Sequence, residues 1–407
     1  MNKIIKLVFL CFQYVVFLFS FLFPRKKNRW IFGAGNNFTD NTKYLYLDII
    51  SNHKDIDAIW ITKNKELVKF LQSKMLPVEY KYSFKGIKYL FTANVYCVSN
   101  YLNLLKNEFT LPLCTIGRAK YVQLWHGVGI KNVLFARNDD LTASKLKHPF
   151  LKWFWTPFHL NVLIKPSLFL STSKNMTEHF IKCFRLNPKN IIISNYPRCE
   201  VFEINKNKEY FKNFANTDEI NTKNTFEKYN QILIYMPTFR DGNRNYLTES
   251  GINFNILNEV MIKEKSLFLF KLHPWSKVDF DITASNFSNL LFLESSIDIY
   301  PILPMIDILI TDYSSIYYDF LLLPDKHTIF FDFDREIYLD ERDLAFDYDE
   351  YTNGVKVKTF NELIKTLQTK NYKNTDKFKD IKLRDFFWEE SENKDNLIQE
   401  IKKLETL

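Results

Sequence analysis

The sequence predicts an α/β protein built on two open parallel sheets, and three observations support this fold class. Short apolar segments, typical of buried strands, alternate with helical segments along the chain. One polar stretch without glycine or proline, residues 203–229, interrupts this alternation. The 407 residues suffice for two domains at about 150 residues per domain.

The first sheet is expected within an N-terminal domain of residues 25–205. Its first strand, "NRWIFGAG", ends in a glycine turn at Gly33 and Gly35, and the helix "NTKYLYLDIISN" follows. The next helix is "KELVKFLQSK". The further strands are "IDAIWIT", "ANVYCVSN", "YVQLWHG", "LFLSTS" and "NIIISNYPR".

The second sheet is expected within a C-terminal domain of residues 230–385. Its strands are "ILIYMPTF", "LFLFKLHP", "LLFLE", "DILITD" and "TIFFDF". Residues 206–229 are interpreted as a helical polar linker. Residues 386–407 are expected to form an amphipathic helix that packs on a domain, because its apolar residues share one face: Leu397, Ile398, Ile401 and Leu404.

Residues 1–24 form a predicted hydrophobic anchor helix. The segment "IIKLVFLCFQYVVFLFSFLF" has about the length that crosses a bilayer. A spanning helix and an interfacial helix are both compatible with it, since Lys6 and Gln13 are seven residues apart and can share one face. No small-residue cleavage site follows, which argues against a secretory signal. The basic residues Arg25, Lys26, Lys27 and Arg29 indicate that the next domain lies on the cytoplasmic side of the cell membrane.

A second segment, residues 145–166, combines basic and aromatic side chains, including Trp153 and Trp155. Two interpretations are open: this segment faces lipid headgroups, or its aromatic side chains belong to the core of the first domain.

Composition narrows the class of partners. The net charge of +8, from 55 Lys and Arg against 47 Asp and Glu, is too mild and too evenly spread to indicate a nucleic-acid-binding protein. This charge suits a protein that handles anions or contacts an acidic membrane surface. The five cysteines are odd in number and lack C-x-x-C spacing, so they support neither a disulfide framework nor a zinc site.

Polar side chains follow four of the predicted strands, at the edge where open parallel sheets bind ligands. His126 ends the strand "YVQLW". The others are Thr238, Arg240 and Asp241 after "ILIYMP", Lys271 and His273 after "LFLF", and Thr311, Asp312, Ser314 and Ser315 after "DILI". Core packing does not explain four such clusters, so the chemistry is expected at these edges, in a cleft between the two sheets.

The segment "DILITDYSSIYYDFLLL" predicts an anion site, because Ser314 or Ser315 begins a helix whose first N–H groups are free. The alternative is an ordinary helix cap. Asp319 lies one turn later in this helix. It either reaches ribose hydroxyls or is a solvated helix residue. Arg240, Lys271 and His273 supply the cations that a diphosphate requires, unless they form surface salt bridges with Asp241 and Asp312.

Two of the chain's nine glycines, Gly127 and Gly129, directly follow His126. Glycine permits a positive φ and the close approach of another group. These glycines therefore either clear space around His126 for a ligand or form a tight turn beside a packed histidine.

Four motifs, "WHG", "MPTFRDG", "KLHP" and "DILITDYSSIYYDF", resemble in order and spacing the CDP-glycerol glycerophosphotransferase family. This family contains teichoic acid primases and polymerases and capsule-forming relatives. The flanking segments "KKNRWIFGA", "DNTKYLYLDI", "ISNYPRCEVF" and "FDYDEYTNGVKVKTFNELI" are also similar to it, so the resemblance runs from about residue 25 to about residue 367.

The resemblance implies a GT-B-like architecture, with two Rossmann-like domains whose parallel sheets face a central cleft. It implies transfer of glycerol phosphate from CDP-glycerol to a hydroxyl of a membrane-bound, lipid-linked acceptor, with release of CMP. By position, His126 matches the family's base and His273 its second essential histidine, whereas Ser314 and Ser315 match the donor phosphate site. Gly127, Gly129 and Arg198 are assigned to the acceptor side.

The chain departs from the family pattern at several positions. Val128 and Gly129 replace Thr-Pro after "WHG", Asn195 replaces a glycine, and Glu200 replaces an aspartate. The departure beside His126 concerns the identity of the acceptor more than the type of reaction.

Two other functions stay open: a GT-B sugar transferase or epimerase that acts on a nucleotide sugar, and an inactive scaffold in a capsule assembly complex. The sequence requires no cofactor and shows no convincing metal cage. It does not distinguish CDP-glycerol from CDP-ribitol, a saccharide from a polyol-phosphate acceptor, or one oligomeric state from another.

Overall fold

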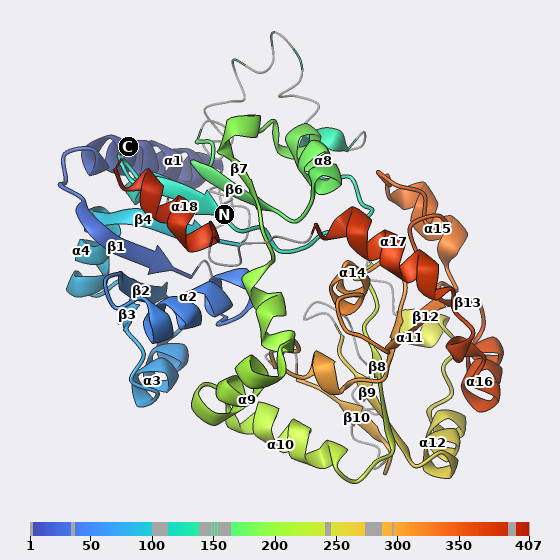
Figure 1. Cartoon of the computed structure of the whole chain (residues 1–407). Coiled ribbons are helices and arrows are strands. Elements are labelled where there is room, and N and C mark those ends of the chain that lie inside the picture. Colours follow the sequence, from blue (N-terminus) through green and yellow to red (C-terminus); the bar gives the residue numbers. More distant parts are fainter. Residues whose placement is uncertain are drawn as a thin grey trace. The chain divides into compact units, whose positions relative to one another are not determined.

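The structure is a computed structural model, and it describes residues 3–33, 37–99, 113–137, 148, 150, 153, 164–240, 246–272, 287–294, 297–389 and 396–406. The chain divides into two compact units, each with its own sheet (Figure 1). The first unit contains residues 1–126, 133–200 and 388–407. The second contains residues 127–132 and 201–387.

The first unit is built on a seven-stranded sheet with the strand order β3-β2-β1-β4-β5-β6-β7. All of its strand pairs are parallel. The strands are β1 (Lys26–Phe32), β2 (Asp57–Thr62), β3 (Val78–Tyr80), β4 (Ala93–Val98), β5 (Lys120–Gln123), β6 (Leu168–Ser171) and β7 (Ile191–Ile193). Its helices include α1 (Lys3–Ser20), α2 (Asp40–Asn52), α3 (Lys65–Ser73), α4 (Phe84–Thr92), α8 (Lys174–Phe184) and α18 (Asn396–Leu404).

The second unit is built on a six-stranded sheet with the order β10-β9-β8-β11-β12-β13, again with only parallel pairs. The strands are β8 (Gln231–Tyr235), β9 (Ser266–Phe270), β10 (Leu290–Phe292), β11 (Ile308–Thr311), β12 (His327–Phe331) and β13 (Val355–Val357). Its helices include α9 (Ile204–Asn213), α10 (Thr217–Phe226), α11 (Tyr246–Glu249), α12 (Phe254–Lys263), α14 (Ile316–Phe320), α15 (Arg335–Glu341), α16 (Phe360–Thr369) and α17 (Lys377–Phe387).

The predicted polar linker therefore contains the helices α9 and α10 of the second unit. The central strands of both sheets are buried along their length, as the near-continuous apolar segments of the sequence predicted.

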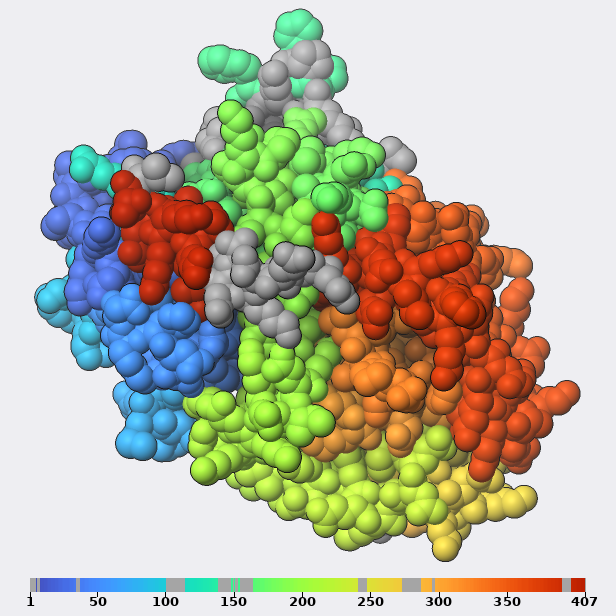
Figure 2. Space-filling view, viewed as in Figure 1, coloured from blue at the N-terminus to red at the C-terminus, as the bar shows by residue number. Residues whose placement is uncertain are grey.

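Helix α18 packs on the first unit, although it is the end of the chain. Its apolar side chains Leu397, Ile398 and Ile401 are buried. Lys402 forms an ion pair with Asp55 at 2.7 Å, and the carboxylate of Glu405 accepts a hydrogen bond from the Trp30 indole. In Figure 2 this red terminal segment lies against the blue N-terminal elements.

Helix α1 covers the first unit with one face and exposes an apolar face. Leu10, Gln13 and Ser20 are buried, so Gln13 lies on the protein side and not on an outer polar face. The exposed apolar side chains follow helical spacing and define what we call the α1 stripe: Ile5, Val8, Phe12, Val15, Leu18, Phe19 and Leu22. Within the described part of the chain, no helix combines the length and the apolar character that a membrane span requires.

Most of the basic side chains that follow α1 form hydrogen bonds or ion pairs within the first unit. Arg25 donates to the backbone carbonyls of Ser20, Ala93 and Thr115 at 2.9–3.1 Å. Lys26 and Arg29 both pair with Asp57. Three of the four cations therefore have a structural role in addition to the topological one that the sequence predicts.

Candidate active site

His126 lies at the end of β5, as the sequence predicts, and the residue before it has an unusual backbone. Trp125 has φ +53°, in the left-handed region that large side chains rarely adopt. The Trp125 ring packs on His126, with ring centroids 4.0 Å apart, and on Phe184. Such a conformation costs about 1–3 kcal/mol and persists only where the surroundings hold it. The turn that presents His126 is therefore strongly held.

The imidazole of His126 is oriented by one backbone contact. Its Nδ1 lies 3.0 Å from the carbonyl oxygen of Ser99, which directly follows β4. Because a carbonyl only accepts hydrogen bonds, Nδ1 carries the proton and Nε2 carries the lone pair. His126 is exposed at the protein surface. Desolvation by the surrounding protein lowers its pKa, and the nearby charge of Arg198 adds to this, while Asp40 and the Ser99 contact act in the opposite direction.

Arg198, assigned from sequence to the acceptor side, supports the backbone of this histidine. The guanidinium is 3% exposed, and its Nη1 donates to the His126 carbonyl and to Asp40 Oδ1, both at 2.8 Å. The buried Asn41 completes the arrangement, because it donates to the carbonyl of Trp125 at 2.9 Å and accepts from the Arg198 N–H. Arg198 therefore ties the backbone of His126 to the start of α2.

The segment after His126 belongs to the second unit. Asn132 donates to the Asp343 carbonyl, and Ala345 donates to the Ile130 carbonyl. Gly129 has φ +157°, and a Cβ atom there would lie 3.5 Å from the Ser315 Cβ, which is ordinary contact. Backbone conformation therefore explains this glycine better than lack of space. Within the second unit, the nearest side chains to this position are those of Ser315 and Tyr318.

The buried cation Arg240 organises the carboxyl edge of the second sheet. Its guanidinium is 1% exposed and forms two hydrogen bonds with Asp334, one with Asp312 and one with the Thr238 carbonyl, all within 2.9 Å. Burial alone lowers the pKa of Arg240, but the carboxylates of Asp312 and Asp334 outweigh it and raise it. Arg240 is thus engaged by protein groups and holds the strand ends together.

Asp312 and Thr311 tie the end of β11 to the end of β8. Asp312 Oδ1 accepts from the N–H of Thr238 at 2.9 Å, and the Thr311 hydroxyl donates to the Met236 carbonyl at 2.7 Å. The Thr238 hydroxyl is buried and has no hydrogen-bond partner among the described residues. These contacts fix the position of the loop that carries Arg240 next to the serine pair.

The serine pair is not used as a helix cap. Ser315 occupies the N-cap position of α14, but its side chain makes no capping hydrogen bond. Both serines are half-buried, and no hydrogen bond of either hydroxyl occurs within the part of the chain that the structure describes. Since α14 has only five residues, the hydroxyls matter more for an anion than the helix dipole. Asp319 is fully buried and accepts from the Tyr300 hydroxyl at 2.6 Å.

Two lysines at this edge have lowered pKa values. Burial lowers the pKa of Lys271 to about 8, partly offset by Asp298 and Glu294, and its ammonium donates to the Glu294 carbonyl. Lys131 was not predicted from the sequence. Burial lowers its pKa to about 8 against the effect of Asp312, and its ammonium lies 5.5 Å from the centre of the Tyr338 ring.

Several predicted positions lie outside the described residues: Gly35, Asp241, His273, Trp155 and most of residues 145–166. Trp153 is described and is 84% exposed. Within the described residues, no group of three or more His, Cys, Asp or Glu side chains is arranged to hold a metal ion.

Other contributors were not predicted: Asp40, Asn41, Ser99 and Asp334. The signal for Asp40 and Asn41 was their place at the start of the helix that follows the first strand. Ser99 and Asp334 contribute a backbone carbonyl and a buried carboxylate, neither of which leaves a pattern in the sequence.

Two parallel sheets, each with polar groups at its carboxyl edge, define a GT-B-like α/β protein. The chain belongs to the CDP-glycerol:poly(glycerophosphate) glycerophosphotransferase family, whose family model matches residues 15–403. This match confirms the resemblance inferred from the motifs.

Two curated relatives from Bacillus spizizenii illustrate the family. The chain is 26% identical to the teichoic acid poly(ribitol-phosphate) polymerase over 89% of its own length, but it spans only 54% of that relative. It is also 26% identical to the teichoic acid poly(glycerol phosphate) polymerase, over 95% of both chains. The fold is similar to that of the wall teichoic acid polymerase TagF, with a TM-score of 0.71 and 20% identity over 100% of this chain and 98% of that one. This likeness confirms the predicted fold class.

Proposed function

We propose that the protein transfers a polyol phosphate, in the first instance glycerol phosphate, from a CDP-activated donor to a hydroxyl of a lipid-linked acceptor and releases CMP. The family membership supports the donor class. The single observation that carries the proposal is the pair of half-buried serine hydroxyls, unused as caps, beside the Arg240 network. CDP-ribitol is the second donor to be tested, because relatives include both glycerol-phosphate and ribitol-phosphate polymerases.

In this proposal His126 is the general base. Its Nε2 carries the lone pair, and its lowered pKa keeps the ring neutral at neutral pH, so Nε2 accepts the proton of the acceptor hydroxyl. The oxygen then attacks the β-phosphorus of the donor, and the bond between this phosphorus and the bridging oxygen breaks to leave CMP. Arg198 donates a hydrogen bond to the His126 carbonyl and so maintains the orientation of the ring.

The donor phosphates are proposed to bind at the carboxyl edge of the second sheet. Phosphoryl transfer depends mainly on positioning and charge stabilisation. The hydroxyls of Ser314, Ser315 and Thr238, which have no hydrogen-bond partner among the described residues, are proposed to donate to the phosphates, and Lys131 and Lys271 supply positive charge. His273 is proposed as the second essential histidine, from its place in the "KLHP" motif.

Attachment to the cytoplasmic face of the membrane is proposed through the α1 stripe. Its exposed aromatic and aliphatic side chains suit the boundary between headgroups and acyl chains, as an interfacial helix requires. A lipid-linked acceptor would then be presented to the enzyme at the membrane surface.

The test is to incubate the purified protein with CDP-glycerol and with CDP-ribitol separately, with membrane lipid acceptors, and to measure CMP. His126→Ala is expected to reduce CMP release by about a hundredfold or more, the usual scale for a general base. His53→Ala, at the end of α2, is the matched control and is expected to keep full activity. Release of a nucleoside diphosphate from a nucleotide sugar, with no CMP from either CDP-polyol, would establish a sugar transferase instead.

A further inference from the structure

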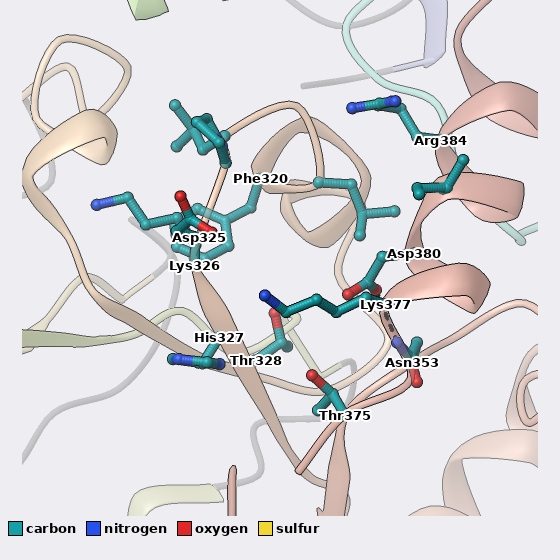
Figure 3. A pocket seen from close by; sticks show the side chains of 14 residues that line it. Phe320, Asp325, Lys326, His327, Thr328, Asn353, Thr375, Lys377, Asp380 and Arg384 are labelled. Atoms are coloured by element: carbon teal, nitrogen blue, oxygen red, sulfur yellow. Dashed lines mark hydrogen bonds between the residues drawn. The ribbon is translucent and has the colours of Figure 1, made fainter. Parts of the chain in front are cut away.

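A second cavity lies in the second unit, away from the serine pair. It has a volume of about 300 Å³ and lies between the connection from α14 to β12 and the face of α17 that carries Lys377, Asp380, Ile381 and Arg384 (Figure 3). His327, one of its lining residues, is the first residue of β12, whereas the serine pair follows the last residue of β11. Because β11 and β12 are parallel and aligned, the cavity and the serine pair lie at opposite edges of this sheet.

Three cationic side chains line this cavity: Lys326, Lys377 and Arg384. Neither the Lys377 ammonium nor the Arg384 guanidinium has a hydrogen bond or ion pair with any residue that the structure describes. Figure 3 shows Lys377 extending across the cavity in front of Thr328. Two long cations that approach one cavity without acidic partners are unusual, because a nearby carboxylate normally satisfies them.

Among the described residues, the acidic side chains near the cavity do not pair with Lys377 or Arg384. Asp380 is held by the Asn353 amide, which donates to its Oδ1 at 2.8 Å. Asp307 and Asp325 act electrostatically on Lys326. The Nδ1 atom of His327 is buried and also lacks a hydrogen-bond partner among the described residues. The unsatisfied groups of the cavity are therefore hydrogen-bond donors, or groups that can become donors on protonation.

We propose that this cavity is a second anion site that binds a phosphate group. Lys377 and Arg384 contribute charge-assisted hydrogen bonds, and the His327 Nδ1 atom supplies a further donor when it carries a proton. Thr328 and Thr375, which also line the cavity, have hydroxyls of the kind that complete phosphate sites. The volume of about 300 Å³ is at the lower end of cavities that hold small ligands, which suits a phosphorylated polyol. The site does not depend on the transferase activity.

The probe is inorganic phosphate, titrated into the full-length protein while CDP-glycerol occupies the donor site. Binding is followed by the NMR signal of the His327 ring, assigned by comparison with His327→Gln, at constant pH and ionic strength. A saturable shift of this signal is expected. Lys377→Gln is expected to weaken phosphate binding by about tenfold or more, the effect of losing one charge-assisted contact.

Lys382→Gln is the matched control, because Lys382 lies on the same helix, is exposed like Lys377 and does not line the cavity. It is expected to bind phosphate as the unsubstituted protein does. Since both lysines are exposed, neither substitution removes a buried contact, and melting temperatures are expected to be unchanged. The proposal is overturned if phosphate causes no saturable shift of the His327 signal, or if the two substitutions weaken binding equally.

Two sources of the phosphate group are distinguished by repeating the titration with glycerol 3-phosphate and with a short oligomer of glycerol phosphate. Tighter binding of the oligomer would identify a phosphodiester chain as the occupant. Binding of glycerol 3-phosphate that equals or exceeds that of the oligomer would identify a free phosphomonoester.

Discussion

The charges around His126 predict that two substitutions shift its pKa in opposite directions. Arg198 lowers the pKa of His126 and Asp40 raises it. Arg198→Gln is therefore expected to raise this pKa, and Asp40→Asn to lower it. A general base loses activity as the pH falls through its pKa, so the acidic limb of the kcat/KM profile is expected to move to higher pH in the first variant and to lower pH in the second.

The direction of each shift follows from the structure. Arg198 is almost fully buried, and its Nη1 donates to the carbonyl of His126 and to Asp40 Oδ1, both at 2.8 Å. Both charges therefore lie close to His126, where a positive charge disfavours the protonated ring and a negative charge favours it.

The assay is CMP release measured from about pH 5 to pH 8, the range in which a histidine titrates, alongside NMR titration of the His126 ring. The NMR measurement reports the pKa even where Arg198→Gln also lowers kcat by releasing the His126 backbone. His53→Ala serves again as the variant with no expected shift. If both substitutions move the His126 pKa in the same direction, or if neither moves it, the proposed charge balance is refuted.

Three further predictions follow from the two units. Replacing Ser314 and Ser315 with Ala is expected to weaken CDP-glycerol binding in calorimetry by about tenfold or more without a lower melting temperature; equal affinity with lower stability would show that they are only a cap. Arg240→Met is expected to destabilise the second unit by about 3–5 kcal/mol in denaturant unfolding, because it removes the buried cation that two buried carboxylates share; an unchanged unfolding curve would contradict this. Replacing Phe12 and Val15 of the α1 stripe with Ser is expected to shift the protein from anionic vesicles to the supernatant in sedimentation, with an unchanged melting temperature; undiminished vesicle binding would exclude the stripe as the membrane contact.

The fold was largely predictable because its central strands carry strong apolar signals. "DILITD" and "LFLFKLHP" are short apolar segments that end in polar residues, and they match β11 and β9 closely. The strands β3 and β13 were not predicted. Each has three residues with a central charged side chain, Glu79 in one and Lys356 in the other, and each lies at a sheet edge. Only pairing with a neighbouring strand distinguishes such segments from loops.

The sequence predicted those site residues that directly follow a strand. It was less informative about residues that act by forming hydrogen bonds or ion pairs with other site residues. Arg240 was predicted either to bind the donor or to pair with Asp241 and Asp312, and the structure shows the Asp312 pair. Its second partner, Asp334, was not predicted because it is 94 residues away in sequence. Lys131 was not predicted because its segment has no strand pattern. It contributes to the second unit only because residues 127–132 pack there, whereas the residues on both sides of this segment belong to the first unit.

The division of the chain has a practical consequence for work with isolated fragments. A fragment of residues 201–387 has the second sheet but lacks residues 127–132, and with them Val128 and Ile130, which are 1% and 2% exposed. The backbone groups of Asp343 and Ala345 would lose their partners, and the serine pair would lose its neighbour Gly129. A fragment of residues 1–200 would in turn contain residues 127–132 without the second unit, on which these residues pack. Neither half is a continuous stretch of sequence, so donor affinity measured on a simple C-terminal fragment would underestimate that of the intact protein. Supplying residues 127–132 as a peptide would be a direct way to restore it.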